Sequence, residues 1–355
     1  MTQPSRLRLG LAVPIFANPG VTDFRTPNFE SLDWQQAEAA VIEAERLGFD
    51  SFWVADHLFL GRDGAIMECW TTLAYLAGLT SRMRLGSIHL GNGFRPAPLT
   101  AKMIASLDVL SRGRLELFID PGWRAREHLA YGFPWEPDRD VRVAQLREAL
   151  DLMRSMWSGD PITHHGRFYD VDGAICAPTP TTDKGPRIWI GEAFDDATLD
   201  LIVRYADVWN SMPAGLDVLA EKIARVDEAC SEAGRDPSTL VKTLETQVLV
   251  YENEGVLADY LARFDSLARQ HPTGDAMTDV IDFVAQTNPH LDAAAAGSGH
   301  VDEFLIGTPD EVATKLNAYA DLGIDEVICW FMDFPDRTGM RLLMSDVVPQ
   351  LGGAL

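Results

Sequence analysis

MRLGSIHLGNGFRPAPLTAKMIASLDVLSRGRLELFIDPGWRAREHLAYGFPW, residues 83–135, is the stretch of sequence that decides the fold. Residues 84–90 and 114–119 are short apolar runs of the strand type, and residues 98–110 between them carry apolar side chains at helical spacing. This order predicts a βαβ unit with two parallel strands. In parallel α/β proteins the loops that follow the strands carry the chemistry, and the loop after the second strand is rich in special residues.

The same alternation of strand and helix extends along the chain on both sides of this unit. Upstream, Asp33 is placed to cap a helix that starts at Trp34, with Gln36 as its capping-box partner, and Gly48 is placed to end that helix. The apolar runs that we predict as strands are 7–13, 50–54, 84–90, 114–119, 187–191, 206–211, 241–251 and 326–331.

About eight strands that alternate with helices predict a parallel sheet, and so many βα units in one chain favour a closed (β/α)8 TIM barrel of the α/β class. An open doubly wound sheet is the alternative. It is weakened because PIFANPG, and not GxGxxG, follows Val13. We expect one barrel domain over residues 1–355. Its excursions at about 159–186 and 252–300 either close over the site or build an interface.

The composition is that of a globular protein with a large core: of 355 residues, 46% are hydrophobic and 23% are charged. The formal net charge is -23. A negative field of this size repels nucleic acid and anionic membranes, so we expect neither as a partner. It also opposes an anionic ligand unless the site supplies local positive charge.

The four cysteines, Cys69, Cys176, Cys230 and Cys329, stand far apart and show no CxxC spacing. We interpret them as reduced thiols of a cytoplasmic protein. The opening MTQPSRLRLGLAVP contains no long apolar run of the signal-peptide kind. No apolar run approaches the roughly 20 residues of a membrane span, so no span is expected.

Several motifs have the wording and order of a known family. They are LGFDSFWVADHLF (47–59), the 84–114 part of the opening stretch, GW followed by EHLAYGFPW (122–135), PRIWIG (186–191) and GTPDEVATKLNAYADLGIDEV (307–327). Together they resemble the bacterial luciferase-like monooxygenase family, especially its deazaflavin-dependent oxidoreductase branch. The resemblance implies a (β/α)8 barrel with insertions, a homodimer and a small organic substrate. It also implies either reduced FMN with dioxygen or coenzyme F-420 for hydride transfer.

The resemblance places acid–base chemistry at the end of the second predicted strand, where this chain has Asp56 and His57. Because histidine exchanges protons near neutral pH, His57 is the candidate acid or base, and Asp56 is a candidate cofactor contact. The alternative role of His57 is that of a core or helix-capping histidine. After the fourth predicted strand, Trp123 is the candidate for the substrate side of the catalytic pocket, with core packing as its alternative.

The resemblance implies that the cofactor ring rests on a bulge after the third strand, often with a non-prolyl cis peptide. This bulge corresponds to Ile88 and His89, which Gly91 follows, and Gly122 of the next loop completes the candidate ring contacts. His89 is larger and more polar than the small apolar residue usual at this position. Its alternative role is that of an inward-pointing barrel histidine.

The loop after the fifth strand, which the family uses for the cofactor phosphate, departs most from the family pattern. It reads GEAFDDA from Gly191, so Gly191, Glu192 and Ala193 are the candidate phosphate contacts. Glu192, Asp195 and Asp196 bring three carboxylates to this loop, where they repel phosphate and compete with it for the helix dipole. The simpler role of Asp195 or Asp196 is to cap the following helix.

Other chemistries find less support in the sequence. No HxH, HExxH or Cys/His cluster predicts a metal site, and His164 and His165 should point apart on an extended segment. No GxSxG motif supports a nucleophile-elbow hydrolase. A carboxylate pair of the glycosidase kind stays open, because 53 acidic residues create many chance pairs.

Two functional hypotheses follow. The first is an oxidoreductase or monooxygenase of the luciferase-like type, with a pocket lined by aromatic side chains of the strand-end loops. The candidates for that lining are Phe16, Phe59, Phe94, Trp123 and Phe133. The second is a cofactor-free barrel paralogue that serves as a binding subunit or performs a non-redox reaction. The acidic loop after the fifth strand is what motivates this second hypothesis.

Overall fold

The computed structural model describes residues 6–20, 27–192, 195–271 and 303–352. In these residues a ring of parallel strands closes into a barrel, because β12 pairs with both β1 and β10. The barrel strands are β1 (Arg8–Ala12), β2 (Ser51–Val54), β3 (Arg84–Ser87), β5 (Leu115–Asp120), β8 (Arg187–Gly191), β9 (Val208–Ser211), β10 (Val241–Val250) and β12 (Glu326–Phe331). The predicted TIM barrel is confirmed, and the alternative of an open doubly wound sheet is wrong.

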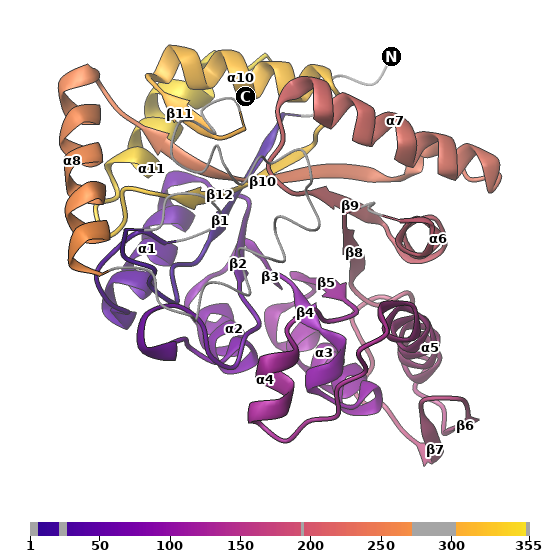
Figure 1. Ribbon diagram of the computed structural model, residues 1–355. Coiled ribbons are helices and arrows are strands. Elements are labelled where there is room, and N and C mark those ends of the chain that lie inside the picture. The colour runs from indigo at the N-terminus through magenta and orange to yellow at the C-terminus, as the bar shows by residue number, and fades with distance from the viewer. Residues whose placement is uncertain (1–5, 21–26, 193–194, 272–302, 353–355) are drawn as a thin grey trace.

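Figure 1 shows the helices as an outer layer around the strands, and the colour follows the chain around the barrel. The helices are α1 (Trp34–Leu47), α2 (Cys69–Leu79), α3 (Ala97–Ser111), α4 (Ala125–Ala130), α5 (Arg139–Met156), α6 (Asp196–Tyr205), α7 (Leu216–Glu232), α8 (Glu254–Gln270), α10 (Pro309–Asp321) and α11 (Thr338–Leu342). Two short strands, β4 (Leu90–Gly91) and β11 (Leu305–Gly307), pair in parallel with the carboxyl ends of β5 and β10.

Helix α1 begins and ends where the sequence predicts. The Asp33 carboxylate accepts hydrogen bonds from the backbone N–H groups of Gln35 and Gln36, and Gly48 ends the helix in the left-handed conformation at φ 100°. The predicted capping-box role of Gln36 is wrong, because its side-chain oxygen instead accepts a hydrogen bond from Arg337. The cap is therefore made by the aspartate alone.

The middle of the barrel is filled by aromatic side chains. Trp53 and Trp189 lie 4.5 Å apart between ring centroids, and Phe118 packs against both. Glycine on the neighbouring strand makes room for this cluster, since a Cβ at Gly86 would lie 2.5 Å from the ring of Trp53. The barrel is thus a packed core and not a pore, and any site lies above or below this layer.

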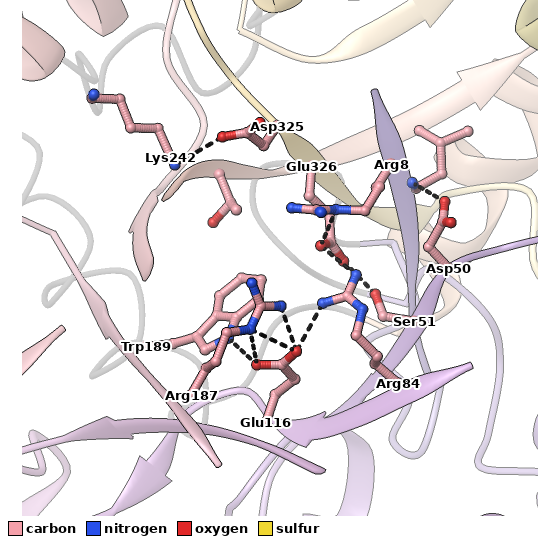
Figure 2. Close-up of polar contacts among 12 residues, drawn as sticks. Arg8, Asp50, Ser51, Arg84, Glu116, Arg187, Trp189, Lys242, Asp325 and Glu326 are labelled. Carbon is pink, nitrogen blue, oxygen red and sulfur yellow. Dashed lines mark hydrogen bonds and ion pairs between the residues drawn. The ribbon is translucent and has the colours of Figure 1, made fainter. Parts of the chain in front are cut away.

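The amino-terminal end of the barrel is closed by an ion-pair network (Figure 2). Arg84 at the start of β3 bridges two carboxylates, with Nη1 3.0 Å from Glu116 Oε1 and Nη2 2.6 Å from Glu326 Oε2. Arg187 and the indole N–H of Trp189 also donate to Glu116. Burial opposes the charge of Arg84, but the two carboxylates outweigh it and raise the pKa of its guanidinium. We assign this network to stability, because residues at this end of a TIM barrel lie far from the loops that carry chemistry.

The described parts of both predicted excursions contain regular secondary structure. Residues 159–186 contain an antiparallel hairpin of β6 (Ile162–His165) and β7 (Asp170–Ala174), and Figure 1 shows it projecting beyond α5. Residues 252–300 begin with α8, while their part from 272 onward lies outside the described residues. None of the described helices combines the length and the apolar character needed to cross a membrane.

Candidate active site

Two cavities lie at the carboxyl ends of the barrel strands. The smaller has a volume of about 70 Å³ and is lined by His57, Ile88 and Phe94 among others. The larger has a volume of about 340 Å³ and extends toward α5 and α6. The residues that line both cavities, and so form the wall between them, are His89, Asp120, Gly122 and Trp123. This wall is made by the loops that follow β3 and β5.

His57, directly after β2, is oriented by a buried carboxylate on α4. Its Nδ1 lies 2.8 Å from Oε2 of Glu127. Burial raises the pKa of Glu127, but hydrogen bonds from His57 and from the Phe59 backbone N–H, together with the nearby Arg124, lower it overall. The carboxylate is therefore ionised and holds Nδ1 as the donor, which leaves Nε2 as the nitrogen for proton exchange.

The carboxylate of Asp56 binds the loop that follows β3 and does not point its oxygens into the small cavity. Its carboxylate accepts hydrogen bonds from both terminal nitrogens of Arg95, at 2.8 and 2.9 Å, and from the backbone N–H of Gly91 at 3.1 Å. Burial raises the pKa of Asp56, and the Arg95 guanidinium opposes that rise. Asp56 lines the small cavity, but its oxygens are occupied by the loop after β3, whose position they fix, and its contact with a cofactor stays a prediction.

Ile88 and His89 form the expected bulge after β3, and the peptide bond between them is cis. The His89 side chain points toward the barrel axis between two carboxylates. Its Nδ1 lies 3.3 Å from Asp120 Oδ2, and its Nε2 lies 3.5 Å from Glu245 Oε1 of β10. The bulge places Ile88 in the small cavity and the imidazole in the wall that both cavities share.

Trp123 stands beside His57 in the small cavity. The two rings meet edge to face with centroids 5.5 Å apart. The loop turns at Gly122, whose φ is 83°, and its backbone N–H donates to Asp120 Oδ1 at 2.6 Å. The turn places the indole beside His57, where it lines both cavities, and its role on the substrate side stays a prediction.

The acidic loop after β8 is organised differently from the prediction. Glu192, with φ 43°, is buried, and its carboxylate lies 3.1 Å from Lys222 Nζ of α7. Asp195 caps α6 by accepting the backbone N–H of Thr198, and it forms an ion pair with Arg139 of α5. The predicted simpler role of Asp195 is confirmed. Ala193 lies outside the described residues.

The expectation that this loop repels phosphate assumed that its carboxylates are unpaired, and the structure shows them in ion pairs. Each of the three carboxylates has a cationic partner, and the exposed Asp196 lies 3.7 Å from Arg225. The guanidiniums of Arg139 and Arg142 both line the larger cavity. Burial lowers the pKa of Arg142, and repulsion from Arg139 adds to this lowering. An anion bound between the two guanidiniums would relieve that repulsion.

The site residues fit a flavin or deazaflavin cofactor. The larger cavity has the size of a small-molecule site, and its walls combine apolar side chains with a few charged ones. Its apolar lining is Ile119, Ile190, Leu201 and Met212. The bulge at Ile88 and His89 offers a surface for a planar ring. Arg139 and Arg142 offer partners for an anionic tail. Gly191 also lines the larger cavity, and a Cβ at this position would lie 3.1 Å from the Phe118 ring.

The predicted aromatic lining is correct in part. Phe16, Phe94 and Trp123 line the small cavity. Phe59 instead stacks on Tyr131 and lies under the guanidiniums of Arg124 and Arg126. Phe133 packs behind Phe94, with centroids 6.5 Å apart. These two rings support the cavity wall from outside and are corrections to the prediction.

Four charged residues of the site were missed by sequence reasoning: Glu127, Arg95, Arg139 and Glu245. Glu127 stands in a motif that carried the resemblance, without a role attached to it. Glu245 had a signal, because Thr243, Glu245 and Gln247 alternate along a strand and so put polar groups on one buried face. In the described ranges, no three His, Cys, Asp or Glu residues are grouped so that they could hold a metal ion.

The adjacent histidines of β6 lie away from this site. His164 Nε2 is 3.2 Å from Glu148 on α5, and His165 Nδ1 is 2.6 Å from Asp170 of the same hairpin. They point to opposite sides, as predicted. No described residue of 159–186 lines either cavity.

The family of the chain follows from comparison with known proteins. A family model described as luciferase-like monooxygenase matches residues 11–326. The chain belongs to the luciferase-like monooxygenase family, which confirms the resemblance of its motifs, and it is an oxidoreductase.

Two similar curated proteins give the range of activities among relatives. Phthiodiolone/phenolphthiodiolone dimycocerosates ketoreductase of Mycobacterium tuberculosis (strain ATCC 25618 / H37Rv) is 29% identical over 337 residues, which cover 82% of this chain and 86% of that protein. F420-dependent glucose-6-phosphate dehydrogenase of Microbacterium testaceum is 27% identical over 315 residues, covering 87% and 90%.

Solved structures share the fold at lower identity. An F420-dependent secondary alcohol dehydrogenase in complex with an F420-acetone adduct superposes with a TM-score of 0.74 at 18% identity, covering 98% of this chain and 99% of that one. The oxygenating constituent of 3,6-diketocamphane monooxygenase from Pseudomonas putida, in complex with FMN, gives 0.73 at 18%, covering 98% and 100%. At such identities the likeness concerns the fold alone.

Proposed function

We propose that this protein transfers a hydride between coenzyme F-420 and a small organic alcohol or carbonyl compound. The observation that carries the proposal is the pair of His57 and Glu127, 2.8 Å apart at the edge of the small cavity. Reduction of a carbonyl group or oxidation of an alcohol needs one proton exchanged at the substrate oxygen, and an oriented imidazole is suited to that exchange. The two curated relatives described above are named a ketoreductase and an F420-dependent dehydrogenase.

The chain's own residues supply binding, orientation and the proton. His57 gives or takes the proton at Nε2, and Glu127 keeps Nδ1 protonated during the exchange. Phe16, Phe94 and Trp123 surround the substrate and exclude water from the small cavity. The cofactor, when bound, supplies the hydride.

The candidate cofactor contacts divide between the bulge after β3, at the wall that the two cavities share, and the far end of the larger cavity. Ile88, His89 and Gly91 would hold the ring at the bulge after β3, with Gly122 facing them. At the other end, Gly191 and the guanidiniums of Arg139 and Arg142 would hold the phosphate of the tail. This arrangement replaces the glycine-rich turn of the family by two cations from α5.

The alternative of a cofactor-free binding subunit loses its main support. It rested on three unpaired carboxylates at the phosphate position, and Glu192 and Asp195 are each paired with a cation. Monooxygenation with reduced FMN and dioxygen remains the second chemistry of the family, and the same cavities suit its cofactor.

The test is a binding titration of the purified protein with coenzyme F-420 and with FMN, each oxidised and reduced, followed by fluorescence and calorimetry. Micromolar binding of coenzyme F-420 is expected, and His89→Trp, which fills the larger cavity, should abolish it. Micromolar binding of FMN with no binding of coenzyme F-420 would assign the monooxygenase chemistry instead. A folded protein that binds neither cofactor in either redox state would overturn the proposal and favour the binding subunit.

We also propose that the protein is a cytoplasmic homodimer. The neighbouring helices α2 and α3 expose large apolar side chains, of which Leu110 is 72% exposed. The others on these helices are Tyr75, Leu79, Leu99 and Val109. A second copy of the chain would cover them. The four cysteines are buried free thiols, which suits a reducing compartment. Sedimentation velocity should show a dimer, and Leu110→Glu should yield monomers.

A further inference from the structure

A further histidine, one position after Glu127 on α4, lines the small cavity. His128 is 2% exposed, and its ring packs against Phe94 and Trp135, with centroids 4.5 and 4.8 Å away. The proton exchange proposed for His57 does not use this side chain. The surroundings of its two ring nitrogens show that packing alone does not explain an imidazole at this place.

The backbone of α4 fixes Nδ1 of His128. This nitrogen lies 3.1 Å from the carbonyl oxygen of Arg124, one helical turn earlier in the chain. A carbonyl oxygen only accepts hydrogen bonds, so Nδ1 carries a proton and donates it. Nε2 is therefore the nitrogen that is left to contact a molecule in the cavity.

Nε2 of His128 lies beside the glycines of two loops. A Cβ at Gly93, after β3, would lie 2.5 Å from Nε2, and a Cβ at Gly122, after β5, would lie 4.0 Å from it. The absence of a side chain at position 93 thus makes room for the imidazole. Among the described residues, none donates a hydrogen bond to Nε2 or accepts one from it.

A buried imidazole with no protein partner at Nε2 is an unfavourable way to fill this space. Phenylalanine would make the same ring contacts with Phe94 and Trp135 and would have no polar atom to remove from water. Polar atoms in buried positions ordinarily have a hydrogen-bond partner. Nε2 of His128 therefore points to a bound group as its partner.

A second polar side chain of the same cavity also has an unused hydrogen-bonding atom. Asn18, after β1, lines the small cavity and is 3% exposed. Its Nδ2 is buried and has no hydrogen-bond partner within the described ranges. An amide nitrogen only donates, so it suits an oxygen of a ligand. The small cavity thus offers two polar contacts in addition to Nε2 of His57.

The size and lining of the cavity limit which ligand can use these contacts. A volume of about 70 Å³ gives room for roughly five water-sized groups. Asp56, Asp120 and Glu127 also line the cavity, so an uncharged hydroxyl suits it better than an anionic group. One oxygen of the substrate is needed at His57, and the other polar contacts suit a further oxygen close to the reacting carbon.

We propose that Nε2 of His128 binds a second hydroxyl group of the substrate, with Asn18 as a further polar contact, so that the substrate is a small diol or hydroxycarbonyl compound. This inference deepens the proposed function and rests on it for the reaction. His128 sets the specificity of binding, and His57 remains the residue of proton exchange. Loss of the Nε2 contact should weaken the binding of such a substrate and leave the chemical step in place.

The first experiment compares alcohols that differ by one hydroxyl group. Reduction of coenzyme F-420 is followed with 2-butanol, butane-2,3-diol and butane-1,3-diol as the probes. The wild type should favour at least one diol over 2-butanol by about tenfold or more in kcat/KM. His128→Phe should bring this ratio close to one, through a higher KM for the diol. Because the ratio compares two substrates of one protein, a partial loss of folded enzyme does not change it.

Two further variants control for the structural role of the ring. His128→Gln should keep part of the preference, since its amide reaches about as far along the side chain as Nε2. His165→Phe makes the same chemical change on the exposed hairpin and should leave the ratio at the wild-type value. Equal kcat/KM values for 2-butanol and both diols in the wild type would overturn the inference while the proposed function stands. A diol preference that persists in His128→Phe would overturn it as well.

The second experiment does not depend on turnover. The histidine ring nitrogens are isotopically labelled, and NMR follows Nε2 of His128, assigned from its loss in His128→Phe. The three alcohols are added with and without reduced coenzyme F-420, which cannot accept a hydride from them. The Nε2 signal should move with a diol and not with 2-butanol. If it does so but no alcohol is oxidised, the proposed function fails and the hydroxyl site stands. A signal that neither diol moves would overturn the inference.

Discussion

His57 at the end of β2 and Glu127 on α4 stand 70 positions apart in the chain, and a 2.8 Å contact joins them. The other oxygen of Glu127 accepts the backbone N–H groups of Leu58 and Phe59 at 2.8 and 3.0 Å. One carboxylate thus fixes both the imidazole and the backbone that follows it. Nε2 of His57, the nitrogen that we propose for proton exchange, is thereby held in a fixed position at the cavity, as such an exchange would require.

His57→Asn should lower kcat by about 10²–10⁴-fold, because the variant keeps a polar side chain but cannot exchange a proton at neutral pH. Calorimetry should show cofactor binding within about twofold of the wild type, since His57 lines the small cavity and not the larger one. His165→Asn, on the exposed hairpin, is the matched control and should leave kcat unchanged. A kcat of His57→Asn close to that of the control would remove His57 from the chemistry.

The sequence alone predicts the barrel because each strand is a short apolar run that can be recognised without knowledge of its neighbours in space. The apolar runs at 187–191 and 326–331 are β8 and β12, with the predicted bounds. The helix caps Asp33 and Gly48 act within their own neighbourhood, so their roles are also readable from the chain. Such features depend on residues within a turn or two of one another.

The site was less predictable, because its partners come from distant loops. Glu192 and Asp195 looked like a barrier to phosphate, since nothing in the sequence links them to Lys222 on α7 and Arg139 on α5. The same holds for Glu245, which reaches His89 only through the closure of the barrel. Charge counted along the chain is therefore a poor measure of charge in the folded site.

The buried carboxyl of Asp333, after β12, should make stability depend on pH. Burial raises its pKa to about 7, although the backbone N–H of Gly339 donates to Oδ2 at 2.8 Å and opposes the rise. Between the ordinary value of 3.8 and about 7, the folded protein binds this proton and the unfolded chain does not. The free energy of unfolding should therefore fall as the pH rises through this window, by up to about 1.4 kcal/mol per pH unit.

Asp333→Asn tests this dependence, because asparagine keeps the oxygen that accepts from Gly339 and cannot ionise. Urea unfolding at several pH values from about 5 to 8 should show that the variant loses less stability than the wild type as the pH rises. Asp236→Asn is the control, since that carboxylate is exposed and the backbone N–H of Ser238 lowers its pKa. Parallel stability curves for the wild type and Asp333→Asn would show that Asp333 does not titrate in this window.

The network at the amino-terminal end of the barrel should matter for stability and not for binding (Figure 2). Glu116→Ala leaves the guanidiniums of Arg84 and Arg187 without their shared carboxylate, and breaking a buried ion pair from one side costs about 3–5 kcal/mol. Urea unfolding should show a loss of this order, with cofactor affinity unchanged in the folded protein. Asp170→Ala, which removes an exposed carboxylate paired with His165, should leave the unfolding midpoint where it is. Equal unfolding midpoints for the two variants would mean that water solvates the guanidiniums of Arg84 and Arg187 well enough to replace the lost Glu116 carboxylate.

Arg139 should distinguish FMN from riboflavin, which lacks the phosphate. The guanidinium contacts Asp195 and donates to the Thr198 hydroxyl at 2.7 Å, and both groups stand at the start of α6. A phosphate at this place can replace Asp195 as the partner of the Arg139 guanidinium. A charge-assisted hydrogen bond of this kind contributes about 1.5–3 kcal/mol to binding. Arg139→Gln should therefore weaken FMN binding by roughly 10- to 100-fold and leave riboflavin binding unchanged. Arg204→Gln, whose guanidinium contacts Asp200 further along α6, should change neither affinity. If Arg139→Gln weakens both ligands equally, Arg139 shapes the cavity without binding the phosphate.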